Sequence, residues 1–180
     1  MNIVVLTGSP HKKGTSALLA DKFIEGANEA GHNIFRFDSA FEDVSPCKAC
    51  EHCNLTGKGC IYNDSMNKLN KKLINSDMIV FVTPLYYFGM SSQLKIVIDR
   101  FYANNSKIMA KNKKTILMAT SADNKDWTMK ALKNHYKTIV EKYMGWKDVG
   151  IILATGCGVR SDIESTDYPN QAYKLGKNLN

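Results

Sequence analysis

The sequence predicts an α/β fold in which a parallel β-sheet is covered by helices on both faces. Two patterns alternate along the chain: short apolar runs rich in β-branched residues, and longer segments whose apolar residues recur at helical spacing. The short runs are suited to strands that are buried on both faces. Strands that alternate with helices form parallel sheets with right-handed crossovers. Because the chain contains no internal repeat and no linker that would split it, we predict one domain over residues 1–180.

The first half of the chain alternates strand, helix, strand and helix. Asn2–Thr7 is an apolar, β-branched run, and the helical pattern that follows the next turn continues until Gly31. Asn33–Asp38 predicts a short second strand. Apolar residues at helical spacing over Met66–Ile74 predict a second helix, with Asp64 as its N-cap.

The second half continues the same alternation. Met78–Thr83 reads MIVFVT, predicts the third strand and is expected to end at Pro84. Apolar residues over Leu94–Phe101 predict the third helix. The remaining predicted elements are a strand over Thr115–Thr120, a helix over Met129–Tyr143, a strand over Val149–Ala154 and a closing helix over Asn170–Leu179.

The formal net charge of +7 does not indicate nucleic-acid recognition. Among the 24 basic residues the only arginines are Arg36, Arg100 and Arg160, and no run of lysines is longer than two. Base-edge and bidentate phosphate recognition favours arginine, so we predict no specific nucleic-acid partner. A lysine-rich surface instead attracts phosphorylated small molecules.

No segment of the sequence predicts secretion or membrane insertion. The apolar N-terminal run is too short for a signal peptide and has no cleavage site. The longest apolar stretch, 78–90, is interrupted by Thr83 and Pro84 and is too short to span a bilayer. We therefore expect a cytoplasmic protein that does not contact membranes.

The turn after the first strand, GSPHKKGTS, has the features of an anion site. Ligands of such sheets bind outside the carboxyl ends of the strands. Gly8 permits a sharp turn, and Thr15 and Ser16 open a helix whose free N–H groups favour an anion. The spacing matches neither a Walker A loop nor G-x-G-x-x-G. The turn predicts a bound phosphomonoester, with an ordinary helix start as the alternative.

The loop after the third strand carries an unusual number of large apolar side chains. Residues 84–90 read PLYYFGM, and exposed aromatic side chains are costly unless something covers them. A flat aromatic ring system bound beside the loop would explain this composition. A subunit interface would explain it too, and both explanations can hold.

Four of the five cysteines lie within one short segment, CKACEHCNLTGKGC. Disulfides are rare in a reducing cytoplasm, so metal binding is the stronger interpretation. C-x-x-C-x-x-C is the spacing of ferredoxin-type cluster sites, whereas Cys₄ zinc sites usually consist of two separated pairs. Gly57 and Gly59 permit the chain to fold back. A [4Fe–4S] cluster, zinc and no stable metal all remain open; the candidate ligands are Cys47, Cys50, Cys53 and Cys60.

Together these motifs resemble the flavodoxin-like NADPH-dependent FMN reductases, in particular their iron–sulfur flavoprotein and NAD(P)H oxidoreductase branch. The similarity extends from GSPHKKGTS through TPLYYFGMSSQLKIVIDRF to the closing YPNQAYKLGKNL. It implies a flavodoxin-like three-layer sandwich with a five-stranded parallel sheet and bound FMN. The expected cofactor-binding residues are Ser9, His11, Lys13, Thr15 and Ser16 in the first turn, Pro84, Leu85, Tyr86, Tyr87 and Phe88 in the aromatic loop, and Thr120 and Ser121 after the fourth strand.

The resemblance implies an FMN-dependent NAD(P)H oxidoreductase that passes a hydride from a nicotinamide to a small-molecule electron acceptor. Because the flavin carries this chemistry, no catalytic side chain is predicted. The alternative is an iron–sulfur flavoprotein that exchanges single electrons with a ferredoxin-like partner protein. In either case we expect a homodimer or homotetramer, with the flavin site close to the subunit boundary. The cysteine segment is expected near the same edge of the sheet as the flavin.

Overall fold

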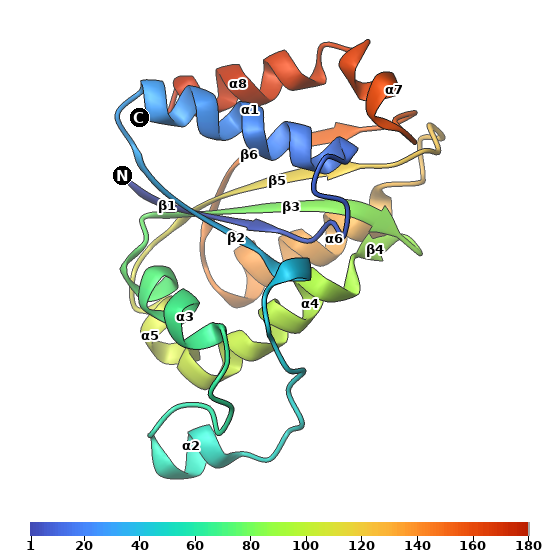
Figure 1. Ribbon diagram of the computed structural model, residues 1–180. Helices are drawn as coiled ribbons and strands as arrows, with labels where there is room; N and C mark the ends of the chain where they lie inside the picture. The colour runs from blue at the N-terminus through green and yellow to red at the C-terminus, as the bar shows by residue number, and fades with distance from the viewer. Residues whose placement is uncertain (180) are drawn as a thin grey trace.

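The computed structural model describes residues 1–179 and confirms the α/β fold. A twisted sheet forms the middle of three layers, with α1, α7 and α8 on one face and α3, α4, α5 and α6 on the other (Figure 1). The short helix α2 lies in a lobe that projects beyond the second helical layer. The helices are α1 (Thr15–Glu29), α2 (His52–Thr56), α3 (Met66–Asn75), α4 (Ser92–Asp99), α5 (Asn105–Met109), α6 (Lys130–Lys137), α7 (Arg160–Glu164) and α8 (Tyr168–Lys177).

The sheet has the strand order β2-β1-β3-β5-β6, and these strands are all parallel. All five predicted strands are confirmed, and the change of direction in strand order lies between β1 and β3. The strands are β1 (Asn2–Thr7), β2 (Asn33–Asp38), β3 (Met78–Tyr86), β5 (Lys114–Thr120) and β6 (Lys147–Ala154), with a two-residue strand β4 (Gly89–Met90) antiparallel to β3. In such a sheet, ligands bind beside the carboxyl ends at this switch point.

The expectation that Pro84 ends the third strand is wrong, because β3 continues to Tyr86. The Gly8 N–H donates to the Val82 carbonyl at 2.8 Å, so the backbone groups of Val82 point toward β1. Backbone groups alternate in direction along a strand, and the nitrogen of Pro84 therefore points to the same side. There β1 has already ended at Thr7, so no ladder hydrogen bond is lost.

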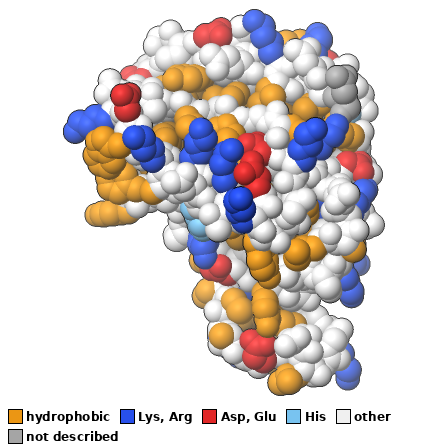
Figure 2. All heavy atoms as spheres, turned by 180° about the vertical axis from the view of Figure 1, so that it is seen from behind, with side chains coloured by type: hydrophobic (Ala, Val, Ile, Leu, Met, Phe, Trp, Pro, Cys, Tyr) orange, Lys and Arg blue, Asp and Glu red, His pale blue; other side chains and the backbone are white. Residues whose placement is uncertain are grey.

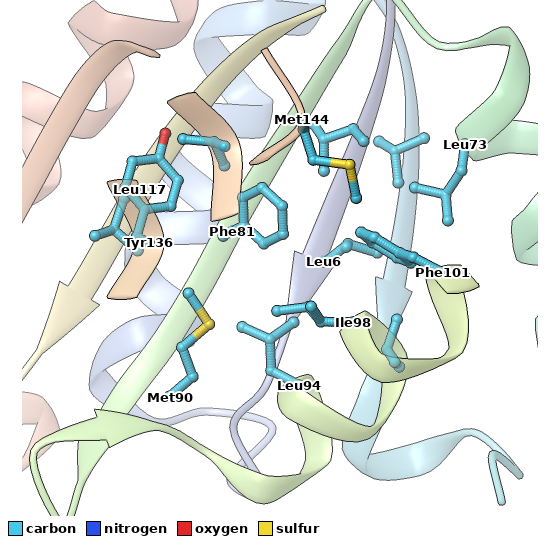
Figure 3. Close-up of a cluster of buried hydrophobic side chains, with 14 of the residues drawn as sticks. Leu6, Leu73, Phe81, Met90, Leu94, Ile98, Phe101, Leu117, Tyr136 and Met144 are labelled. Atoms are coloured by element: carbon cyan, nitrogen blue, oxygen red, sulfur yellow. The ribbon is translucent and has the colours of Figure 1, made fainter. Parts of the chain in front are cut away.

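Two hydrophobic cores fill the spaces between the layers. One lies between α1, α8 and the sheet; the other lies between the sheet and the helices of the opposite layer. Figure 3 shows side chains of the second core, where Phe81 of β3 meets Tyr136 of α6 edge-on at 5.8 Å between ring centres. Tyr136 also donates to Thr115 Oγ1 at 2.9 Å, so its hydroxyl is paired inside the core.

Helix α1 and helix α8 pack at unusually close range through two glycines. A Cβ atom at Gly26 would overlap the backbone carbonyl oxygen of Tyr173, and one at Gly176 would overlap that of Phe23. Only glycine permits this approach. The contact fixes α8 against the sheet layer and, through the preceding loop, the segment that follows β6.

Several helix ends differ from the sequence prediction. The N-cap position of α3 is Ser65 and not Asp64, although the Asp64 carboxylate accepts the Met66 N–H at 3.0 Å and so still pairs this helix start. Gly31 ends α1 with φ = +78°, as predicted. The predicted helix over Met129–Tyr143 is α6 followed by a π-helical segment, Thr138–Tyr143.

The two ends of the described chain meet at the amino ends of the strands. The Met1 amino nitrogen lies 3.2 Å from Nδ1 of His32, and Nε2 of the same ring lies 3.3 Å from the Leu179 carbonyl oxygen. The imidazole therefore links residues 1 and 179, on the opposite side of the molecule from the strands' carboxyl ends (Figure 1). None of the helices described within residues 1–179 is long and apolar enough to cross a bilayer.

Candidate functional site

A cavity of about 680 Å³ opens at the carboxyl edge of the sheet. Its walls come from the loops after β1, β3, β5 and β6, which lie far apart in the sequence. The predicted site residues that line it are Ser9, His11, Lys13, Thr15, Pro84, Leu85, Tyr86, Thr120 and Ser121. The fold thus brings most of the residues expected around FMN to one cavity.

The turn after β1 forms the polar end of this cavity. The His11 N–H donates to Ser9 Oγ at 3.1 Å and the Gly14 N–H donates to the His11 carbonyl at 3.1 Å, so the turn is internally braced. The hydroxyls of Thr15 and Thr120 lie 2.9 Å apart. No side chain of the described residues caps the start of α1 at Gly14. Its first N–H groups and positive dipole end therefore remain available to an anion.

The glycines of this turn are required because a side chain would have no room, and not because the backbone angles are unusual. Gly8 is not among the residues with positive φ. A Cβ atom there would overlap Ser91 Oγ and lie 2.8 Å from Cβ of Leu94, because α4 begins directly beneath the turn. The Ser91 hydroxyl also donates to the Gly8 carbonyl at 2.7 Å. Glycine is thus required at position 8 by the close approach of two loops and not by the backbone angles of a sharp turn.

The aromatic loop forms a two-residue hairpin between β3 and β4. Tyr87 and Phe88 occupy its tip with φ of +45° and +63°, a left-handed conformation that non-glycine residues rarely adopt. Tyr87 is fully exposed, and Phe88 packs against Trp127 with 5.0 Å between ring centres. Neither Tyr87 nor Phe88 lines the cavity, so of the aromatic residues in this loop only Tyr86 does.

The hairpin and Trp127 form an exposed aromatic surface beside the cavity. Tyr86, Phe88 and Trp127 are each about half exposed. Figure 2 shows hydrophobic side chains gathered on a projection at the side of the molecule that carries β4. Strained backbone that persists at such a place is commonly associated with a functional surface. Trp127 was missed by the sequence analysis because it is a single aromatic residue in a polar segment.

Ser16 does not line the cavity, so its contact with a phosphate stays a prediction. Its side chain is 2% exposed and packs inside the first turn of α1. Its backbone still belongs to the helix start that faces the anion site.

The loop after β6 contributes a wall of the cavity that contains none of the predicted cofactor-binding residues. Cys157, Val159 and Arg160 line the cavity, and Arg160 Nη1 donates to the Lys13 carbonyl at 3.4 Å. The rule that ligands bind at strand carboxyl ends would have found this loop had it been applied to the last strand. Burial, with a smaller contribution from Asp162, raises the pKa of the Cys157 thiol, so this cysteine is not an activated nucleophile.

The four clustered cysteines line one separate cavity in the lobe that carries α2. Cys47 and Cys50 are exposed, whereas Cys53 and Cys60 are half-buried. Positive φ angles at Gly57 (+67°) and Gly59 (+88°) return the chain so that Cys60 reaches the other three, as predicted. The fold therefore brings all four candidate ligands to a common space.

A buried ion pair holds this lobe against α4. Arg100 donates to Asp64 through both terminal nitrogens, at 2.6 and 3.2 Å, and to the Ser45 carbonyl at 2.6 Å. The two charged side chains are only 2% and 4% exposed. Arg100 also lines the cysteine cavity, where its buried Nε has no partner among the described residues. A cation thus lines the same cavity as the four thiols.

The position of the lobe differs from the expectation that the cysteines lie near the flavin edge. The cysteine cavity and the larger cavity share no lining residue, and the lobe projects beyond the helical layer (Figure 1). The Arg100–Asp64 pair draws the chain after β2 across α4 and away from the strand ends. Within residues 1–179, no three His, Cys, Asp or Glu side chains form a preformed metal site. The thiols share a cavity without being gathered around one ion.

Comparison with known proteins identifies the family. The family model described as NADPH-dependent FMN reductase matches residues 1–156. The chain belongs to this family. Individual relatives are similar to parts of the chain. An iron–sulfur flavoprotein of Methanocaldococcus jannaschii is 31% identical over 56% of the chain and 51% of its own length. An FMN-dependent NADH:quinone oxidoreductase of Francisella philomiragia is 31% identical over 63% of the chain and 64% of its own length.

Solved structures share the fold of this chain. An NAD(P)H:quinone oxidoreductase from Methanothermobacter marburgensis superposes with a TM-score of 0.77 at 18% identity, over 98% of the chain and 94% of that protein. At this identity the similarity establishes the fold. The chain spans about half the length of the iron–sulfur flavoproteins that it matches.

Proposed function

We propose that the protein is an FMN-dependent NAD(P)H oxidoreductase. The observation that carries this proposal is the uncapped start of α1, which opens with the Thr15 and Thr120 hydroxyls into a cavity of about 680 Å³. An N–H-lined helix start suits a terminal phosphate, and the rest of the cavity has the volume and partly apolar walls that a flavin ring needs. FMN reductase family membership and FMN-dependent relatives support the same cofactor.

In this proposal the protein binds FMN, orients its ring system and shields it from water. The start of α1 holds the phosphate, while Pro84, Leu85 and Tyr86 contact the ring system from one side. The loop after β6 closes the opposite side and is braced to the turn by Arg160. FMN, when bound, supplies the chemistry: it accepts two electrons and a proton as hydride from NAD(P)H and later delivers them to an acceptor. None of the described side chains is needed as an acid or base for the hydride transfer.

Thr15→Asp tests the phosphate assignment. The new carboxylate would lie beside the phosphate, so we expect FMN affinity to fall by about 100-fold or more. Ser92→Asp is the matched control, because it places the same charge at the first residue of α4, which is exposed and does not line the cavity. Flavin fluorescence titration measures both affinities, and circular dichroism checks the fold. Stoichiometric FMN in purified Thr15→Asp protein would show that the assignment is wrong.

The proposal extends to assembly and location. The exposed aromatic surface formed by Tyr86, Tyr87, Phe88 and Trp127 is larger than one bound ring would cover, which supports a homodimer or homotetramer with this surface at the boundary. Light scattering at micromolar concentration measures this, and a monomer contradicts it. We also propose a cytoplasmic location, since reduced free cysteines are typical of that compartment.

We propose, as a second candidate function, electron transfer by FMN together with a [4Fe–4S] cluster and a ferredoxin-like partner. The observation that favours it is the single cavity shared by Cys47, Cys50, Cys53 and Cys60. The thiols fit a cluster by their type and because all four line one cavity, and a neighbouring guanidinium suits an anionic thiolate site. Iron–sulfur flavoproteins among the relatives support it.

Cys50→Ser tests the cluster. In protein prepared without oxygen, we expect iron in the wild type and its loss in Cys50→Ser, with FMN retained because the two cavities are separate. Cys157→Ser, outside the lobe, is the control and should keep its iron. Iron and zinc analysis with a visible absorption spectrum gives the result. Wild-type protein without iron leaves the FMN reductase proposal to stand alone.

A further inference from the structure

A third cavity, of about 310 Å³, lies at the carboxyl ends of β1 and β2. We call it the β2 pocket; its lining includes Thr7, Lys12, Arg36, Asp38, Phe41 and Glu42. It shares Ser9, His11 and Lys12 with the larger cavity, so the two spaces adjoin across the turn that follows β1. A ligand bound in the larger cavity thus has a direct path into the β2 pocket.

The aromatic wall of the β2 pocket is Phe41. This residue ends the short 3₁₀-helix Ser39–Phe41 that directly follows β2, and its side chain is 47% exposed. The ammonium of Lys12 lies 4.8 Å from the ring centre. Lys12 is itself exposed and makes no ion pair within the described part of the chain. An exposed ring beside an exposed cation offers a purine a stacking surface and a phosphate a counter-charge.

The polar wall of the β2 pocket is the last residue of β2. Asp38 accepts hydrogen bonds on Oδ1 from the Thr7 hydroxyl at 2.6 Å and from Arg36 Nε at 2.7 Å. These contacts fix the carboxylate, and its second oxygen has no hydrogen-bond partner within residues 1–179. A fixed carboxylate with an unpaired oxygen can accept hydrogen bonds from the hydroxyls of a ribose.

We propose that the β2 pocket receives the adenosine end of NADH, with the purine against Phe41 and the ribose hydroxyls on Asp38. The inference rests on the proposed oxidation of a reduced nicotinamide in the larger cavity. Strand β2 is two strand spacings, about 10 Å, from β3, and an extended dinucleotide covers that span. Its diphosphate then passes Lys12 and the turn after β1, where positive charge is available.

The charges of the β2 pocket favour NADH over NADPH. A 2′-phosphate on the ribose would face the carboxylate of Asp38, whereas Glu42, which also lines the pocket, is paired with Lys68 at 2.7 Å. Arg36 is occupied, because Nη1 bonds Asp21 at 2.6 Å and Nε bonds Asp38. We expect kcat/KM for NADH to exceed that for NADPH by at least about tenfold, since like charges oppose binding. The family description, in contrast, names NADPH.

The test compares NADH with reduced nicotinamide mononucleotide, which carries the same reacting ring without adenosine. For FMN-loaded wild type we expect a lower KM for NADH. Phe41→Ala should raise the NADH KM by about fivefold to tenfold and leave that of the mononucleotide within about twofold. Phe41→Trp should restore NADH binding. Tyr143→Ala removes an exposed aromatic ring that lines neither cavity, and it should change neither the KM for NADH nor that for the mononucleotide.

Binding of ADP-ribose to the FMN-loaded protein, measured by calorimetry, separates this inference from the proposed function. Weaker ADP-ribose binding in Phe41→Ala than in wild type supports the β2 pocket even if no nicotinamide is oxidised. Oxidation of both nicotinamides with equal KM, or ADP-ribose binding unchanged in Phe41→Ala, overturns the inference and leaves the proposed function intact. A preference for NADPH would overturn the assignment of Asp38.

Discussion

Asp64→Ala is expected to lower the free energy of unfolding by about 3–5 kcal/mol, because it leaves the buried Arg100 guanidinium without its counter-charge. The lost carboxylate also accepts the N–H groups of Ser45 and Met66, at 3.2 and 3.0 Å. Urea denaturation measures the change. Glu25→Ala, which removes an exposed pair with Lys22, is the control and should cost less than about 1 kcal/mol. Similar losses in the two variants would contradict the buried-pair argument.

The same ion pair predicts how stability depends on pH. Burial opposes ionisation of Asp64, but hydrogen bonds from Arg100, Met66 and Ser45 outweigh it and hold the pKa of the carboxyl below its ordinary value of 3.8. The contribution to stability is therefore fully present above about pH 4 and is lost as the pH falls through the lower, folded-state pKa. Asp64→Asn should lack this part of the acid-induced loss, and urea titrations between pH 6 and pH 3 would show it.

Gly26→Ala is expected to lower the melting temperature by about 5–10 °C, because the new methyl group overlaps a backbone oxygen of α8. A backbone atom cannot rotate away, so the two helices must separate. Separation should also loosen the loop after β6, and FMN affinity is expected to fall with it. Calorimetry and flavin titration measure the two effects. Gly89→Ala is the control, since the nearest atom to its Cβ would be 3.9 Å away; an equal loss there would refute the steric explanation.

The central strands β1, β3 and β5 were predictable because each carries an unbroken apolar run that matches burial on both faces. Val80, Phe81 and Val82 of β3, for example, are all at most 1% exposed. Strand ends were less predictable. Whether Pro84 ends a strand depends on which neighbour its nitrogen faces, and that is a property of the register and not of the local sequence. The lobe helix α2 was also missed, since its five residues are too few to show a periodic pattern.

The candidate site was predictable for those residues that directly follow the carboxyl end of a strand. Thr15, Thr120 and Tyr86 meet at one cavity because the carboxyl ends of parallel strands share an edge. Tyr87 and Phe88 do not line the cavity because a two-residue hairpin turns their side chains outward, a geometry set by pairing with β4. Their contact with a flavin stays a prediction. The offset of the cysteine lobe depends on Arg100 meeting Asp64, a contact between residues 36 positions apart that no local spacing encodes.

The imidazole of His32, which links residues 1 and 179, has a practical consequence for electrochemistry. Both residues lie on the side of the molecule opposite to the strand ends (Figure 1). Protein tethered to an electrode through Met1 would therefore present the candidate FMN cavity to the solution, where nicotinamide and acceptor can reach it. Direct electron exchange with the metal surface should then be slow, and substrate-driven current would need a diffusing mediator.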